Sequence, residues 1–122
     1  MKPSTARKKI RKYIDKWQTS LGLGWWKVDV YYHVDKKHIK KVLGSNRVRA
    51  QVNSDWRYSE ATIHFNIPAF IYLEDHEIET VVLHELVHIL VCEMREGKMH
   101  HEERVVTGLT KAFQWVREAA RQ

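Results

Sequence analysis

The stretch His84-Glu85-Leu86-Val87-His88 lies inside the apolar run from Ile78 to Val91 and determines how the rest of the chain is interpreted. Apolar residues recur along this run at 3.6-residue spacing, which predicts a helix from about 75 to 96. Two histidines four residues apart share one helix face, so their imidazole nitrogens can reach one metal ion. The glutamate after the first histidine is then placed to polarise a water molecule. The alternative is a buried helix with two hydrogen-bonded core histidines.

The expected ends of this helix carry suitable signals. Asp75 is the expected N-cap, because its side chain can accept hydrogen bonds from the first backbone N–H groups. Glu77 and Glu79 suit the positive end of the helix dipole. Gly97 is the expected stop. The motif therefore falls in the middle of a helix long enough to be a core element.

The composition indicates a single small domain spanning residues 1–122. The chain is 43% hydrophobic and 30% charged, which is typical of a globular protein. No apolar run approaches the roughly 20 residues of a membrane span, and the basic N-terminus lacks the apolar core of a signal peptide. The single cysteine, Cys92, excludes an internal disulfide and suits a reducing compartment. We therefore expect a cytoplasmic protein without membrane contact.

Charge is distributed unevenly along the chain. Residues 1–57 contain 15 Lys and Arg against 4 Asp and Glu, whereas residues 58–122 contain 6 against 11. A basic surface can bind nucleic acid or acidic partners, so nucleic-acid binding through the basic residues of 2–57 is one hypothesis. The other is a solvated surface combined with charge complementarity between the two halves.

The segments around the motif predict an α+β domain. Residues 4–21 carry one apolar and one basic face, which predicts an amphipathic helix, and residues 100–120 predict a last helix. Three segments alternate apolar and polar residues and are predicted strands: 25–34, the stretch around 48–52, and 61–67. The charged segment 35–41, with four lysines, is interpreted as a connection. This order predicts a small, mainly antiparallel three-stranded sheet with helices before and after it.

A catalytic zinc site commonly has three protein ligands, so a third ligand is expected after the turn that follows the motif. Helical phase places Glu102 on the same side as the apolar stripe of the last helix, while Glu103 is rotated by about 100°. A carboxylate on an apolar stripe is costly unless it is paired or bound to a metal. The sequence therefore favours Glu102 as the third ligand, with Glu103 second and His101 third. Alternatively, both glutamates only favour the helix N-terminus.

At this point the motif and its flanks resemble a known family of folds. Leu83–Leu90, with the preceding strand and residues 101–106 after it, looks like a minimal zincin. The chain is similar over about residues 25–116 to the short gluzincin-like metallopeptidase domains common among phage and prophage proteins, and more distantly to SprT-like proteases. The resemblance implies a zinc (Zn2+) peptidase acting on a peptide or protein substrate in the cytoplasm of a bacterial or phage-infected cell.

The resemblance also implies roles for individual residues. His84 and His88 would be zinc ligands and Glu85 the general base, and the strand from Ala61 to Ile67 would be the sheet edge that aligns the substrate. SprT-like proteins use a third histidine, which would favour His100 or His101 over a glutamate.

Two further points qualify this resemblance. The gap between the motif and Glu102 is short for a gluzincin, and nothing matches the downstream glycine and methionine turn of metzincins. No residue is an evident stabiliser of the oxyanion, although Tyr58, Tyr72 and His64 are available. The rival hypothesis is a nucleic-acid-associated or partner-binding protein with a structural or vestigial zinc site.

Overall fold

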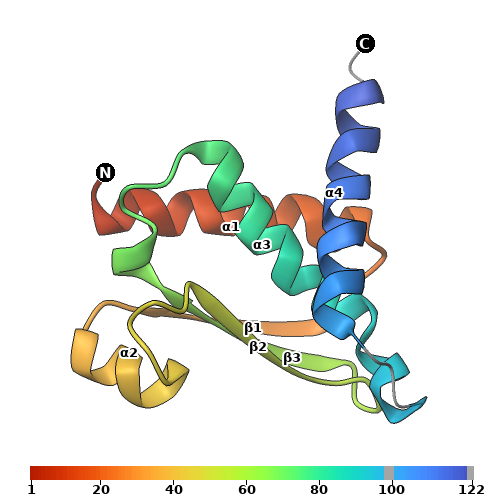
Figure 1. Ribbon diagram of the computed structural model, residues 1–122, viewed down its shortest axis with the longest axis horizontal. Helices are drawn as coiled ribbons and strands as arrows, with labels where there is room; N and C mark the ends of the chain where they lie inside the picture. The colour runs from red at the N-terminus through yellow and green to blue at the C-terminus, as the bar shows by residue number, and fades with distance from the viewer. Residues whose placement is uncertain (98–100, 121–122) are drawn as a thin grey trace.

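The computed structural model describes residues 1–97 and 101–120, and it contains four α-helices and a three-stranded sheet (Figure 1). Their bounds are α1 Pro3–Ser20, β1 Lys27–His33, α2 Lys36–Leu43, β2 Ala50–Asp55, β3 Glu60–Asn66, α3 Asp75–Leu90 and α4 Glu102–Ala120, with the short 3-10 helices η1 Ile67–Ala69 and η2 Cys92–Gly97. This order confirms the predicted α+β class. No helix in the described part of the chain is both long and apolar enough to cross a membrane.

The sheet has the order β1-β3-β2, with β1 parallel to β3 and β2 antiparallel to it. It is therefore a mixed sheet, and the predicted mainly antiparallel pairing is found for only one of the two strand pairs. In register, Ile63 at the centre of β3 lies between Val30 of β1 and Val52 of β2. Strand β3, which follows β2 in the chain, is thus the central strand, and β2 forms one edge of the sheet.

Helices α1 and α3 lie together on one face of this sheet (Figure 1). The inward positions of β3 are apolar, and they pack with the apolar stripes of both helices to form one core. Its largest fully buried side chains include Ile10 and Ile14 of α1, Ile63 and Phe65 of β3, and Ile78, Leu83 and Leu86 of α3. Each such side chain contributes about 1.5–3 kcal/mol when buried, so this core fixes α3 against the sheet.

Helix α2 occupies the segment that the sequence analysis interpreted as a connection, which was wrong. The Asp35 carboxylate accepts a hydrogen bond from the Lys37 backbone N–H at 3.0 Å, and Gly44, with a φ of 81°, ends the helix. Ile39 and Leu43, one turn apart, are its buried residues. The lysines lie on the exposed face of a short amphipathic helix.

Helix α3 begins at Asp75, within the predicted range, but it ends earlier than predicted. Its N-cap is Glu74 rather than Asp75, and the Glu74 backbone N–H donates to the Glu77 carboxylate at 3.1 Å. The α-helix ends at Leu90 instead of continuing to 96, and η2 follows. The motif therefore lies in the last two turns of α3, which lets the chain reverse soon after His88.

Ion pairs join the basic and acidic halves of the chain. Lys9 on α1 pairs with Asp75, and Lys16 pairs with the buried Glu79 at 3.2 Å. The Glu79 carboxylate also accepts a hydrogen bond from the Trp17 indole at 2.9 Å and pairs with Arg117 of α4. Part of the uneven charge distribution is thus internal complementarity, as one of the two hypotheses required.

Candidate metal centre

His84 and His88 lie one turn apart on α3 and project toward the start of α4. Their ring centroids are 4.9 Å apart and the rings meet edge to face at 74°. His84 is about a quarter exposed, whereas His88 is buried. The two imidazoles share one helix face because α3 has regular geometry at the motif. The alternative of two histidines enclosed in the apolar core does not apply.

Glu103, in the first turn of α4, faces the Nε2 atoms of both histidines. Its Oε1 is 2.8 Å from His88 Nε2, and its Oε2 is 3.1 Å from His84 Nε2. One ligand atom from each of the three residues lies within 4.8 Å of the other two. Two imidazole nitrogens and a carboxylate oxygen are a donor set that zinc accepts in three-ligand sites. The residues present therefore fit a zinc ion.

Glu102 contacts the other nitrogen of His88. Its Oε2 is 2.7 Å from His88 Nδ1, and its side chain is 19% exposed, against 74% for Glu103. The phase argument correctly placed Glu102 on the buried side of α4. That side faces Nδ1 of His88, whereas the Nε2 atoms of both histidines point toward the more exposed Glu103.

The remaining candidates for a third ligand lie elsewhere. His101 has a φ of 62°, is exposed, and does not belong to the converging group. His100 lies outside the described residues. The structure therefore groups Glu103 with the two histidines, and it gives Glu102, which the sequence favoured as ligand, a hydrogen bond to His88 Nδ1 instead.

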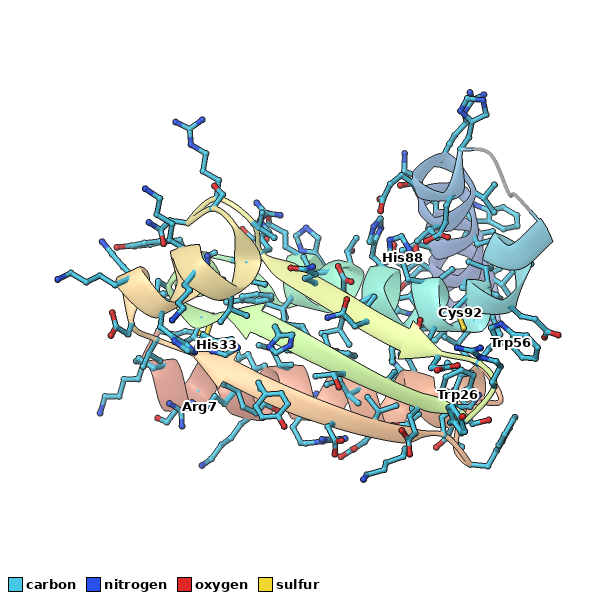
Figure 2. The ribbon with its side chains drawn as sticks, turned by 90° about the horizontal axis from the view of Figure 1, so that it is seen from below. Arg7, Trp26, His33, Trp56, His88 and Cys92 are labelled. Carbon is cyan, nitrogen blue, oxygen red and sulfur yellow. The ribbon has the colours of Figure 1, made fainter. Side chains whose placement is uncertain are left out.

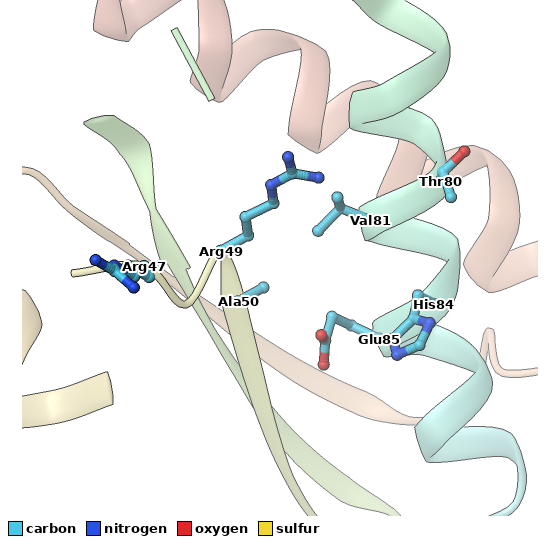
Figure 3. A pocket seen from close by; sticks show the side chains of 7 residues that line it. All are labelled: Arg47, Arg49, Ala50, Thr80, Val81, His84 and Glu85. Atoms are coloured by element: carbon cyan, nitrogen blue, oxygen red, sulfur yellow. The ribbon is translucent and has the colours of Figure 1, made fainter. Parts of the chain in front are cut away.

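Glu85 is buried beside this group. Burial raises the pKa of its carboxyl from 4.5 to about 7, His88 opposes this by lowering the pKa, and the charge of Glu103 adds to it. The side chain leaves α3 on the side that faces β2 (Figure 3). The carboxylate therefore lies between the histidine group and the edge of the sheet.

A cleft separates α3 from β2 and consists of two hollows that share Ala50 and Glu85. The first, of about 350 Å³, is lined by Arg47, Arg49, Ala50, Thr80, Val81, His84 and Glu85 (Figure 3). The second, of about 320 Å³, is lined by Ala50, Gln51, Val52, Glu85, His88, Glu102 and Glu103. The converging histidines and glutamates thus open into a space bordered by the sheet edge.

The edge of β2 offers unpaired backbone groups to this cleft. The Asn66 backbone N–H donates to the Arg49 carbonyl at 2.9 Å, so Arg49 and Gln51 direct their backbone groups toward β3. Alternation along an antiparallel strand then directs the N–H and C=O of Ala50 and Val52 away from β3. No second strand among the described residues pairs with this side of β2.

The resemblance to zincins assigned the edge role to the strand from Ala61 to Ile67, which is wrong. That strand is β3, and both of its sides are occupied by β1 and β2. Alternation in a sequence shows which residues share a face of the sheet, but it does not show which strands are neighbours. The importance of Ala50 and Arg49 was missed for the same reason.

Other residues considered in the sequence lie away from this cleft. Tyr58 and Tyr72 are exposed and do not line either hollow. His64 stacks on Tyr31 and His33 on the outer face of the sheet, with ring centroids 5.3 and 5.1 Å away. Cys92 is buried and lines a separate hollow near Trp26 and Trp56 (Figure 2).

Comparison with known families adds one finding. Residues 10–117, or 108 of the 122 residues, match the model of the SprT-like family. The matched range includes the whole sheet, α3 and the glutamates at the start of α4. No curated protein and no solved structure matches the chain.

Proposed function

The chain belongs to the SprT-like family, and we propose that it is a zinc-dependent peptidase that hydrolyses an extended peptide held in the cleft between β2 and α3. The family has a zincin-like metallopeptidase fold and binds zinc, which makes this chemistry the first expectation. The narrower resemblance to phage-type minimal zincins and the cytoplasmic location stay predictions.

The observation that carries the proposal is the convergence of His84 Nε2, His88 Nε2 and the Glu103 carboxylate beside an open strand edge. These three groups would hold the zinc ion. When bound, zinc supplies a Lewis acid that activates water and polarises the substrate carbonyl. Glu103, rather than the Glu102 favoured by helical phase, is therefore our candidate for the third ligand.

Glu102 acts in this proposal as a positioning residue. In the tautomer that binds a metal through Nε2, the Nδ1–H of His88 donates a hydrogen bond to the Glu102 carboxylate at 2.7 Å, which fixes the ring orientation and leaves Nε2 without a proton. Only a deprotonated nitrogen can be a metal ligand. This charge-assisted hydrogen bond accounts for a half-buried carboxylate on the apolar side of α4.

Glu85 serves as the general base. Its carboxylate borders both hollows of the cleft, so it is within reach of a water molecule and of a peptide bond held there. Glu85 takes the proton of the attacking water and passes it to the leaving amine. Burial keeps the carboxylate away from bulk solvent while it holds that proton.

The edge of β2 aligns the substrate. An extended peptide can add to a free strand edge through main-chain hydrogen bonds, and here the groups of Ala50 and Val52 are directed outward for this purpose. A peptide bound in this way runs along β2 from one hollow to the other and passes over Glu85, which borders both.

Cleavage of an unfolded protein tests the proposal. We expect the purified full chain to cut a denatured protein, to lose this activity in a chelator, and to regain it when one equivalent of zinc is returned. Cleavage that continues unchanged in the chelator would exclude zinc-dependent hydrolysis.

The alternative function is association with nucleic acid, and one observation favours keeping it as a second candidate. Lysines 36, 37, 40 and 41 of α2 are exposed and have no carboxylate partner among the described residues, whereas several basic residues of α1 are paired. Salt-sensitive retention of the protein on DNA, weakened when these four lysines become glutamine, would support this role.

A further inference from the structure

The hollow on the His84 side of the cleft combines an apolar floor with two guanidinium groups. Ala50 and Val81 form the floor, and Arg47 and Arg49 lie where the chain enters β2. Figure 3 shows the Arg49 side chain extending from the strand toward Val81 on α3, while Arg47 turns the other way. Arg49 therefore spans the cleft at the side where a bound peptide would leave the catalytic group.

Arg47 and Arg49 differ from the arginines that form ion pairs within the protein. Three arginines are paired with carboxylates of the protein: Arg11 with Asp15 at 2.8 Å, Arg57 with Asp55 at 3.2 Å, and Arg117 with Glu118 at 2.9 Å. Among the side chains that the structure describes, those of residues 1–94 and 101–120, no carboxylate lies within 4.0 Å of Arg47 or Arg49. A guanidinium presents a planar fork of N–H donors that matches a carboxylate, so a ligand can supply what the protein does not.

Charge divides the cleft into two parts. The second hollow is lined by three glutamates, Glu85, Glu102 and Glu103, whereas the first contains two arginines and only the shared Glu85. A negatively charged group is repelled from the second hollow, with its three glutamates, and attracted to the first, with its two arginines. Opposite charges at the two ends also oppose a substrate bound in the reversed position.

Register places Arg49 close to the cleaved bond. Arg49 is adjacent to Ala50, which borders both hollows together with Glu85. One residue of a strand spans about 3.3 Å, so Arg49 lies within one or two substrate residues of the bond facing Glu85. Its long side chain reaches over the cleft and can meet a substrate side chain in the first hollow.

Resting on the proposed peptidase function, we infer that Arg49, with Arg47 beside it, binds a carboxylate of the substrate next to the cleaved bond. This carboxylate has two sources, an Asp or Glu side chain within a peptide, or the C-terminal carboxylate of a peptide that ends in the hollow. Both present the same planar anion to Arg49, and the experiment below distinguishes them.

Binding to the Glu85→Gln protein measures this preference without hydrolysis. The probes are fluorescein-labelled ten-residue peptides with amidated C-termini. They are identical except at one central position at a time, which is Glu, Gln or Lys. A further pair ends at the central position with a free or an amidated C-terminus. We expect anisotropy titrations to show about tenfold tighter binding for the peptide with the recognised carboxylate, which is the size of one charge-assisted hydrogen-bonded pair.

Arg49→Gln in the same protein should remove this preference, and the charge-matched control Lys27→Gln should retain it. Lys27 is exposed on β1, the opposite edge of the sheet. A preference for Glu at one internal position identifies an acidic side chain as the ligand, and a preference for the free terminus identifies the C-terminal carboxylate. An undiminished preference in Arg49→Gln would overturn the inference, as would Arg49-dependent binding of single-stranded DNA without any carboxylate preference among the peptides.

The result also separates this inference from the proposed function. If the wild-type protein cleaves denatured protein but its Glu85→Gln variant does not distinguish Glu from Gln peptides, peptidase activity stands and the carboxylate site is rejected. If Arg49-dependent carboxylate binding occurs without hydrolysis by the wild type, the site stands and the peptidase function is rejected.

Discussion

Exchanging the two glutamates at the start of α4 distinguishes a metal ligand from a positioning residue. Glu103 faces the Nε2 atoms of both histidines, and Glu102 contacts Nδ1 of His88. Removal of Glu103 should therefore delete one bond to the metal. Removal of Glu102 should leave all three ligands in place and only loosen the orientation of His88.

The structure gives the size of each effect. The Glu102 contact is short, at 2.7 Å, and His88 is buried, so its loss should weaken zinc binding by about 10–100-fold. A four-ligand zinc site contributes about 10–16 kcal/mol in total, so a single ligand accounts for about 3 kcal/mol, or more than about 100-fold. We expect Glu103→Ala to lose more zinc affinity than Glu102→Ala.

Glutamine variants sharpen the comparison. In Glu102→Gln the side-chain amide oxygen can still accept the Nδ1 proton, so only the charge-assisted part of the bond is lost, about fivefold in affinity. In Glu103→Gln a neutral amide replaces an anionic ligand, and the loss should approach that of Glu103→Ala. The two positions therefore respond differently to the same conservative change.

Competition with a chromophoric chelator measures the zinc affinity of each variant, and Glu60→Gln at the start of β3 is the matched control for loss of one surface carboxylate. Circular dichroism of the zinc-free proteins checks that the fold is retained. If Glu102→Gln loses zinc and Glu103→Gln keeps it, Glu102 is the third ligand and the assignment made here is incorrect.

Three other outcomes follow from the strand edge and the buried ion pair. Val52→Pro removes an N–H that points away from β3, so we expect a folded protein with weakened peptide binding. Gln51→Pro breaks the hydrogen-bond ladder to β3 and should unfold the protein. Equal stability of the two variants in urea would refute the assigned register. Glu79→Gln leaves Arg117 without its buried partner and should lower the unfolding free energy by about 3 kcal/mol at pH 7, measured by urea denaturation. A loss within about 0.5 kcal/mol, the scatter of a surface substitution, would show that the pair contributes little. Burial alone would raise the pKa of Glu79, but hydrogen bonds from Arg117, Trp17 and Lys16 outweigh it and hold the pKa below 4.5. This stabilisation is therefore present above the unfolded-state pKa and is lost as the pH falls through the lowered value, so the difference between wild type and Glu79→Gln should shrink in acid; a constant difference down to about pH 3 would contradict this.

The sequence predicted the elements better than their arrangement. The 3.6-residue spacing correctly identified the helix that carries the motif, because apolar periodicity reflects which face is buried. Helix α2 was missed, although Asp35 and Gly44 supply its caps and Ile39 and Leu43 its buried face. Four lysines in a short segment concealed this pattern, since eight residues contain only two buried positions.

Strand order was not predictable from the same kind of pattern. Alternation assigned Ile63 and Val52 to the inner face correctly, but it does not state which strand is central. The role of substrate edge, which the resemblance placed on β3, therefore could not be checked against the sequence pattern. The parallel pairing of β1 with β3 depends on how the chain crosses through α2, and this is a tertiary property.

Burial did not predict which of the two glutamates faces the histidine Nε2 atoms. Helical phase correctly identified Glu102 as the more buried glutamate, but it does not give the direction in which the histidine Nε2 atoms point. That direction depends on the imidazole rotamers and on the approach of α4, neither of which is encoded in spacing. The more exposed Glu103 lies on the side to which both Nε2 atoms point.

The most direct test of the account is a side-by-side measurement of zinc content and hydrolysis for wild type and Glu85→Gln. Elemental analysis gives the zinc per chain, and cleavage of a denatured protein gives the activity. We expect one zinc ion per chain in both proteins, because Glu85 is not a ligand, and hydrolysis only in the wild type. Undiminished hydrolysis by Glu85→Gln, or a wild-type protein without zinc after growth and purification with zinc present, would contradict the central claim.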